Sequence, residues 1–225
     1  MPAIEFVIHG EPATVEIHDL VIAGWTGRDR ATVEHHIAEL EAIGVARPRS
    51  VPCFYRVGAN LLTTAPTIDV TGTDGSGEVE FVLVSLPRGM YVGVGSDHTD
   101  RKVEAYGVTV SKQMCPKPVS RELWPFAEMK ANWDSLVLRS RITRDHQQLL
   151  YQEGVVTRML SPEDLITRYT GGSATLPAGT AMFCGTMPLM APMGFATEFK
   201  MELEDPVQNR ILHHQYSVRV LPYND

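Results

Sequence analysis

The stretch from Glu78 to Val84, which reads EVEFVLV, carries two carboxylates directly into an apolar run. It follows a glycine-rich turn at residues 72–77, GTDGSG, and its composition predicts a strand. Because successive side chains of a strand point to opposite faces, Glu78 and Glu80 project from the same face, roughly 6.6 to 6.8 Å apart. Two carboxylates on a strand that enters a core are unfavourable unless a cation meets them.

A third carboxylate, Asp97, lies in the segment GVGSDHTDR at residues 93–101. Three oxygen ligands suit a hard divalent cation, magnesium first, with manganese or calcium as alternatives. No cysteine or histidine spacing competes for a softer metal. On spacing alone, however, a pair of glutamates lies more often on the solvent face of an edge strand. Both interpretations remain open at this point.

Composition limits the class of protein. The chain has 225 residues, of which 44% are hydrophobic, and it contains no repeat and no linker, so we expect one domain over residues 1–225. A net charge of −7 argues against a nucleic-acid groove or an anionic membrane surface and favours a small-molecule partner. The N-terminus lacks a basic stretch followed by an apolar segment. Three widely spaced cysteines indicate free thiols in a reducing compartment, so we expect a cytoplasmic protein.

The periodicity along the chain predicts many strands and few helices. Residues 30–44 form the clearest helix, which Asp29 or Thr32 can cap and Gly44 ends. Prolines leave residues 103–125 without a regular period, and Ser161 begins a short helix. Strands are expected near residues 5–8, 14–17 and 20–24 as an N-terminal meander, and near 53–56, 81–84, 91–95, 135–140, 180–184, 197–204 and 215–221. The fold class expected is α+β, predominantly mixed β.

Six short motifs, taken in order, resemble the fumarylacetoacetate hydrolase superfamily. They are His36-x-x-Glu39, Pro52-x-Phe54-Tyr55-Arg56, Glu78-Val79-Glu80, Ser96-Asp97-x-x-x-Arg101, Lys112, and the segment LPAGTAMFCGTMP at residues 176–188. The resemblance covers about residues 22 to 221 and is closest to an uncharacterised branch of the superfamily. It implies a fumarylacetoacetase-like β-roll in one catalytic domain, with N-terminal strands at residues 1–24, a candidate lid helix at residues 25–45, and a homodimer.

The resemblance also implies roles for individual residues. Glu78, Glu80 and Asp97 would hold the divalent metal. The catalytic residues would be His36 and Glu39, which activate water, and Lys112, which reaches the substrate. The residues that line the substrate site would be Tyr55, Arg56, Gln113, Gly185 and Thr186.

Three positions depart from the superfamily pattern. Ser96 stands where asparagine is usual, Lys102 where an aspartate usually follows Arg101, and Thr180 where an aspartate usually follows Gly179. The neighbouring His35 could replace His36 as the working residue, and His36 could also be a partly buried histidine with no catalytic role. Fold therefore transfers more safely than substrate.

The chemistry that these residues support is hydrolysis of a carbon–carbon bond in a small oxo-carboxylate, a dicarbonyl compound, through a metal-stabilised enolate. Lys112 would act as an electrostatic clamp on the substrate carboxylate or the developing charge. The alternatives are decarboxylation or hydration of an oxo-acid, or a non-catalytic homologue that binds a metal or a small molecule.

Overall fold

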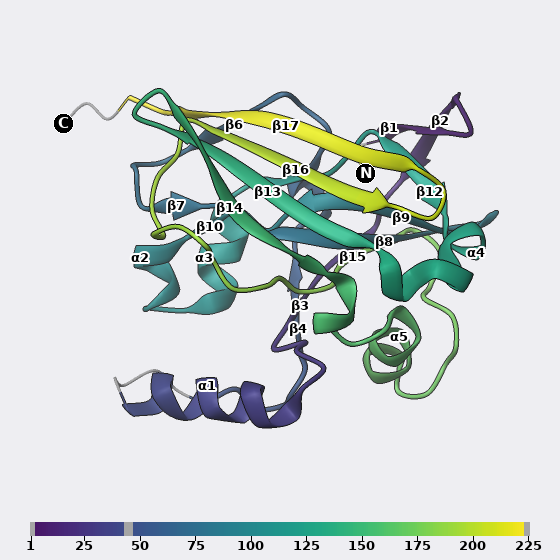
Figure 1. Cartoon of the computed structure of the whole chain (residues 1–225), viewed down its shortest axis with the longest axis horizontal. Helices are drawn as coiled ribbons and strands as arrows, with labels where there is room; N and C mark the ends of the chain where they lie inside the picture. The colour runs from purple at the N-terminus through teal and green to yellow at the C-terminus, as the bar shows by residue number, and fades with distance from the viewer. Residues whose placement is uncertain (1–2, 43–46, 223–225) are drawn as a thin grey trace.

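The computed structural model of the protein describes residues 3–42 and 47–222. Two sheets pack face to face through most of the molecule, and the helices gather at the ends and below (Figure 1). The larger sheet has eight strands in the order β2-β1-β12-β9-β8-β15-β3-β4, and the smaller has five in the order β14-β13-β16-β17-β6. Parallel and antiparallel pairs occur in both, so the mixed-β fold class is confirmed.

The element bounds are as follows. The larger sheet contains β1 (Ala3–Ile8), β2 (Glu11–Glu16), β3 (Asp19–Gly24), β4 (Cys53–Val57), β8 (Val79–Leu86), β9 (Gly89–Ser96), β12 (Glu122–Pro125) and β15 (Thr180–Phe183). The smaller sheet contains β6 (Thr67–Val70), β13 (Val137–Arg144), β14 (Gln147–Val155), β16 (Glu198–Asp205) and β17 (Arg210–Val220). Two short pairs join β10 (Thr99–Asp100) to β7 (Gly75–Ser76) and β11 (Lys117–Pro118) to β5 (Leu62–Thr63).

The helices are short except for the first. They are α1 (Arg30–Ala42), α2 (Arg101–Glu104), α3 (Val108–Met114), α4 (Phe126–Met129) and α5 (Pro162–Thr170), with 3-10 turns η1 (Ala59–Leu61), η2 (Lys130–Ser135) and η3 (Val156–Arg158). Among the residues that the structure describes, no helix has the length and apolar character needed to cross a membrane.

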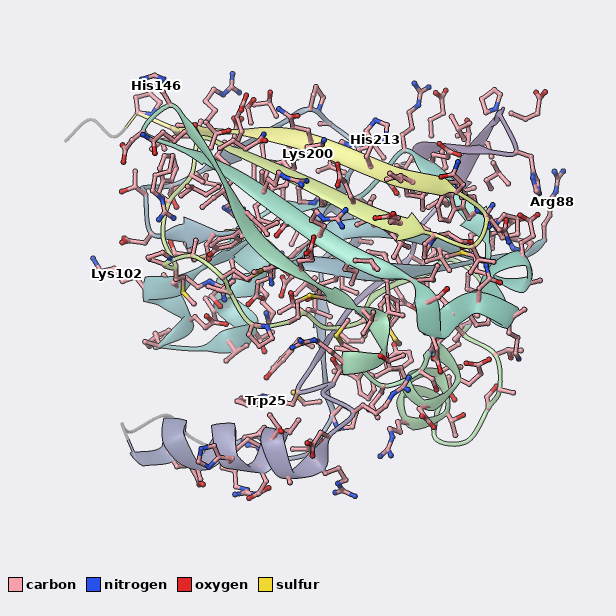
Figure 2. The ribbon with its side chains drawn as sticks, in the orientation of Figure 1. Trp25, Arg88, Lys102, His146, Lys200 and His213 are labelled. Carbon is pink, nitrogen blue, oxygen red and sulfur yellow. The ribbon has the colours of Figure 1, made fainter. Side chains whose placement is uncertain are left out.

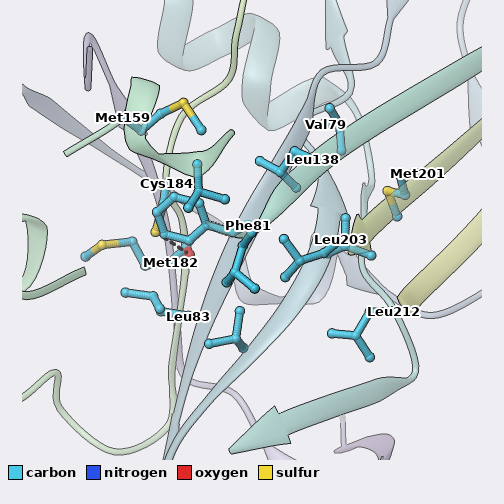
Figure 3. Packing of buried hydrophobic residues seen from close by; sticks show 14 of the residues in the cluster. Val79, Phe81, Leu83, Leu138, Met159, Met182, Cys184, Met201, Leu203 and Leu212 are labelled. Carbon is cyan, nitrogen blue, oxygen red and sulfur yellow. Dashed lines mark hydrogen bonds between the residues drawn. The ribbon is translucent and has the colours of Figure 1, made fainter. Parts of the chain in front are cut away.

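Strand β8 is the centre of the fold, because it is buried on both faces. Val79, Phe81 and Leu83 point toward the smaller sheet, and Phe81 packs edge-on against Trp133 with ring centroids 5.0 Å apart. Figure 3 shows this cluster between the sheets. The alternate residues Val82, Val84 and Leu86 join a second apolar cluster on the other face. β8 pairs with β9 and β15, so its glutamates do not lie on an edge strand.

Most of the predicted strands and both predicted helices are present, but two expectations were wrong and one long strand was not predicted. β1 and β2 form a hairpin, whereas β3 lies across the sheet between β15 and β4, so there is no N-terminal meander. Residues 103–125 contain α3, β11 and β12 rather than irregular structure: Pro116 lies between α3 and β11, and Pro118 and Pro125 are the last residues of the two short strands. β14 was not predicted, since its sequence QQLLYQEGV is half polar and only its pairing with β13 makes it a strand.

Helix α1 begins as predicted. The Asp29 carboxylate accepts a hydrogen bond from the Ala31 backbone N–H at 2.9 Å and another from Thr32 at 3.4 Å, which caps the first turn. The helix lies beyond the ends of β3 and β4, apart from the two sheets (Figure 1), and Trp25 marks its junction with β3 (Figure 2). Residues 43–46, where the helix was expected to end, lie outside the described residues.

We expect Phe81→Ala to lower the free energy of unfolding by about 3 to 5 kcal/mol, because it removes a fully buried ring from the contact between the sheets. Urea denaturation measures the change. Val207→Ala is the matched control, since Val207 is 66% exposed and its truncation should change stability by less than about 0.5 kcal/mol. Equal effects of the two substitutions would show that β8 is not central to the core.

Candidate metal and substrate site

Three carboxylates meet where β8 begins and β9 ends. The antiparallel register pairs Val79 with Ser96, so Glu78 and Asp97, the next residues outward, lie opposite each other. The Asp97 backbone N–H donates to the Glu78 carbonyl at 3.0 Å. Glu80, two residues after Glu78 along the strand, projects to the same side as Glu78. One oxygen from each carboxylate lies within 4.8 Å of the other two. The sequence expectation that the three groups face one point thus agrees with the geometry.

The electrostatics of this cluster suit a cation. Glu80 and Asp97 are 2% and 1% exposed. Burial and the neighbouring charges of Asp97 and Glu78 raise the pKa of Glu80 well above its ordinary value, although the Gly185 backbone N–H donates to its Oε2 at 2.6 Å. Carboxylate oxygens are the ligands that hard divalent ions prefer, so these residues fit a magnesium-type ion. Their role as ligands stays a prediction.

Two lysines contact the same aspartate. The Lys112 ammonium donates to Asp97 Oδ2, and Lys117 Nζ lies 3.1 Å from Asp97 Oδ1. Burial alone would raise the pKa of Asp97, but the two ammonium groups outweigh it and hold that pKa below its ordinary value. Burial alone would lower the pKa of Lys112, but the negative charges of Asp97 and Glu78 outweigh burial and raise that pKa above its ordinary value. Lys112 therefore stays protonated at neutral pH.

Arg101 holds the outer glutamate. Its Nη2 lies 3.2 Å from Glu78 Oε1, its Nε donates to Ser76 Oγ at 2.7 Å, and its Nη1 donates to Glu104 at 2.9 Å. These three contacts fix the guanidinium at the start of α2, next to the carboxylates. Glu78 is consequently the only one of the three carboxylates that pairs with an arginine among the described contacts.

Ser96, Tyr216 and His98 form a hydrogen-bonded network next to the carboxylates. Ser96 Oγ accepts from the Glu78 backbone N–H at 3.2 Å and lies 2.9 Å from the Tyr216 hydroxyl, which is 3.1 Å from His98 Nδ1. Burial, together with the charges of Lys117 and Arg101, lowers the pKa of His98 to about 3, so its ring is neutral. His98 is only 3% exposed, and its ring contacts Tyr216.

The structure separates the residues expected to bind substrate on β4. The Tyr55 ring centroid lies 5.9 Å from Lys112 Nζ, which puts this half-buried ring beside the site. Arg56 points to the other face of the strand and pairs with Asp19. The structure thus brings Tyr55, and not Arg56, toward Lys112.

The other residues expected to bind substrate also differ in whether they contact the carboxylate site. Gln113 is exposed, and its Oε1 accepts from the Gly58 backbone N–H at 2.8 Å, so it links α3 to the turn after β4 rather than facing the carboxylates. Thr186 Oγ1 donates to the Val79 carbonyl at 2.8 Å and is thereby tied to β8. Gly185 touches the site directly through its bond to Glu80.

Gly185 is required at its position. Its φ is +95°, and a Cβ there would lie 1.7 Å from Thr26 Oγ1. Thr26 is 4% exposed and stands two residues after β3, on the path to α1. The backbone that binds Glu80 and the segment that leads to α1 are therefore in direct contact.

The side chains of His36 and Glu39 lie outside the described part of the chain, although their backbone belongs to α1. Their role in activating water stays a prediction, as does the choice between His36 and His35.

Sequence reasoning did not find Lys117, which is fully buried against Asp97. One signal was available, because Lys117 stands between Pro116 and Pro118 in an otherwise uncharged run from Gln113 to Ser120. Proline excludes a continuing helix and favours an extended path, along which one side chain turns inward. Tyr216 was also missed, since nothing in the sequence relates β17 to Ser96.

Comparison with known proteins supports this description. A family model described as "Protein of unknown function (DUF2848)" matches residues 23–216. No curated protein matches the chain. Structures of the fumarylacetoacetate hydrolase family share the fold. One is a protein of Oleispira antarctica, provisionally described as a fumarylacetoacetate isomerase/hydrolase, with a TM-score of 0.66, 16% identity, and coverage of 96% of this chain and 100% of that one.

Two further structures bear on the site. A fumarylacetoacetate hydrolase family protein of yeast has a TM-score of 0.60 at 17% identity, with coverage of 92% of this chain and 95% of that one. A 2-keto-3-deoxy-D-arabinonate dehydratase complexed with magnesium and 2,5-dioxopentanoate has a TM-score of 0.61 at 16% identity, with coverage of 93% and 77%. At these identities the likeness shows the fold, which confirms the β-roll expected from the motifs.

We expect Glu80→Gln to stabilise the metal-free protein at pH 8 by roughly 1 kcal/mol, because it removes one of three mutually repelling charges. Folding raises the pKa of Glu80, so the contribution of Glu80 to stability is fully present below the ordinary pKa of a glutamate and is lost as the pH rises through the raised value. The same substitution should abolish the stabilisation that magnesium gives the parent. Thermal unfolding with EDTA and with magnesium tests both effects. A variant that magnesium still stabilises as strongly as the parent would remove Glu80 from the site.

Proposed function

We propose that this protein, which belongs to the DUF2848 family, is a metal-dependent enzyme that hydrolyses a carbon–carbon bond in a small oxo-carboxylate. The observation that carries the proposal is the cluster of the half-buried Glu78 with the buried Glu80 and Asp97, in which Lys112 contacts Asp97. The fold supports it, because several structures that share this fold belong to the fumarylacetoacetate hydrolase family.

One oxygen from each of Glu78, Glu80 and Asp97 would hold the ion, which we propose to be magnesium. A bound divalent ion supplies Lewis-acid polarisation of a substrate carbonyl. Three carboxylates leave ligand positions for the substrate, and a dicarbonyl compound with a carboxylate can fill two of them. The dehydratase complexed with magnesium and 2,5-dioxopentanoate, a protein of the same fold, supports this choice of ion and ligand class.

Lys112 is the residue that would bind the substrate carboxylate. It is buried, protonated and placed on a flexible side chain beside Tyr55, so it can move from Asp97 to an anion that enters the site. Arg101 is committed to Glu78, Glu104 and Ser76, so it is less able to take this role. Tyr55 would form one wall of the substrate site.

His36, oriented by Glu39, would activate the water that hydrolysis needs. Two residues three apart on a helix lie on the same face, which allows the glutamate to orient the imidazole. The support from the structure is indirect: α1 follows directly on the segment of Thr26 that touches Gly185, and Gly185 binds Glu80. Closure of α1 over the carboxylates would bring the base to the substrate.

A second candidate is an oxo-acid lyase, that is, a dehydratase, hydratase or decarboxylase. It is favoured by the fact that the neighbour with magnesium is a dehydratase. Both reactions need the metal and Lys112, and they differ in whether water attacks a carbonyl carbon. A homodimer and a cytoplasmic location, expected from the resemblance and the composition, remain part of the proposal.

The test is product analysis with a panel of acylpyruvates and 2-keto-3-deoxy sugar acids in the presence of magnesium. Hydrolysis of an acylpyruvate yields pyruvate and a second carboxylic acid that gains one oxygen from 18O-water. Decarboxylation yields carbon dioxide, and dehydration yields an unsaturated or dioxo acid without a new carboxylate. The proposal fails if the magnesium-loaded protein transforms none of these compounds and binds none of them.

We expect Lys112→Met to lower kcat by about 100-fold or more and to weaken oxalate binding, because the variant lacks the charge that meets the substrate carboxylate. Steady-state kinetics and calorimetry with oxalate measure the two effects. Lys130→Met is the matched control, since Lys130 is a surface residue that pairs with Glu163 at 2.9 Å. Oxalate binding as tight as that of the parent would make Lys112 a structural residue.

We expect His36→Ala and Glu39→Ala each to lower kcat by roughly 100-fold while leaving metal affinity unchanged, which is the usual size of a general-base effect. Glu41→Ala on the same helix serves as the control, because Glu41 pairs with Arg47 at 3.3 Å and lies at the surface. His35→Ala, measured alongside, decides between the adjacent histidines. Parent rates in the His36 and Glu39 variants would exclude the pair from the mechanism.

A further inference from the structure

The two oxygens of Asp97 are held by different cations. Oδ1 lies 3.1 Å from Lys117 Nζ and accepts a hydrogen bond from Thr99 Oγ1 at 3.3 Å. Oδ2 accepts from Lys112. Each oxygen of a carboxylate has two lone pairs, so the two donors on Oδ1 leave none there for a metal, whereas the single donor on Oδ2 leaves one.

Lys117 is the partner that cannot give way. Its side chain is 0% exposed, and its ammonium also donates to the His98 carbonyl at 2.5 Å. Its backbone is fixed as well, because β11 pairs with β5 through Lys117 and Pro118. A buried ammonium that left these acceptors would lose its only described partners inside the protein.

Lys112 is the partner that can give way. Its side chain is 7% exposed, and Asp97 Oδ2 is its only carboxylate contact among the described residues. Because Oδ1 is held by Lys117 and Thr99, a cation shared by the three carboxylates would bind Oδ2. The positive charge of that cation would repel the Lys112 ammonium from this oxygen.

We propose that Lys117 is a positioning residue that restricts Asp97 to one-oxygen ligation and so makes the site select magnesium or manganese over calcium. The inference rests on the proposed metal-dependent function. Calcium takes six to eight oxygen ligands and commonly uses both oxygens of a carboxylate, whereas magnesium requires a small octahedral shell. With Oδ1 held by Lys117 and Thr99, the second oxygen of Asp97 is closed to the ion.

The experiment is calorimetric titration of the parent, Lys117→Met and Lys112→Met proteins with magnesium, manganese and calcium at one ionic strength. Each variant removes one positive charge near the ion, which should tighten binding of all three ions by a similar factor. The ratio of the calcium and magnesium dissociation constants cancels this charge effect. We expect Lys117→Met to shift the ratio toward calcium by about 10-fold, the usual size of an effect on the groups that orient a metal ligand.

Lys112→Met is the matched control, because it frees Oδ2 and leaves Oδ1 held. It should tighten magnesium and calcium binding alike and leave their ratio within about two-fold of the parent. A ratio in Lys117→Met that equals the parent's, with magnesium still bound, overturns this inference and leaves the proposed function intact. A parent protein that binds none of the three ions overturns both.

The parent alone provides a second measurement that does not depend on the folding of a variant with a substituted buried lysine. It should bind magnesium at least as tightly as calcium. Tighter binding of calcium by the parent would show that Asp97 is not restricted to one oxygen, and the inference would be wrong.

Discussion

The mutual repulsion of Glu78, Glu80 and Asp97 is the constraint on which the organisation of this protein depends. Three carboxylates gathered at the end of a buried strand are destabilising unless positive charge surrounds them. The chain meets this requirement with two lysines on Asp97 and an arginine on Glu78. The cluster is therefore nearly balanced in charge before any ion enters.

The surrounding elements hold this cluster in place from several directions. The hairpin of β8 and β9 brings the carboxylates together, while α3 and β11 bring the lysines from a segment that follows it in sequence. The turn after β15 adds the Gly185 amide. Because β8 is buried between two apolar clusters, the carboxylates stand at the end of a strand that is packed on both faces. The helix that carries the proposed base lies apart from the two sheets, between β3 and β4 in the sequence (Figure 1).

The sequence was sufficient for the parts that depend on local pattern. Alternation put Glu78 and Glu80 on one face, the order of six motifs indicated the β-roll, and Asp29 capped α1 as expected. The sequence was insufficient where pairing between strands distant in the chain determines the structure. β3 joined β15 instead of β2, and the half-polar β14 became a strand only beside β13. Lys117 was not predicted as a site residue for the same reason. Its position between two prolines does not indicate burial unless its contact with Asp97 is known.

The most direct test of the account is a crystal structure of the protein soaked with manganese, with data collected at the manganese absorption edge. The account predicts one anomalous peak about 2.0 to 2.6 Å from a single oxygen of each of Glu78, Glu80 and Asp97. Lys117 should remain on Asp97 Oδ1, and Lys112 should have moved away from Oδ2. A peak elsewhere, or an ion bound through both oxygens of Asp97 with Lys117 displaced, would contradict it.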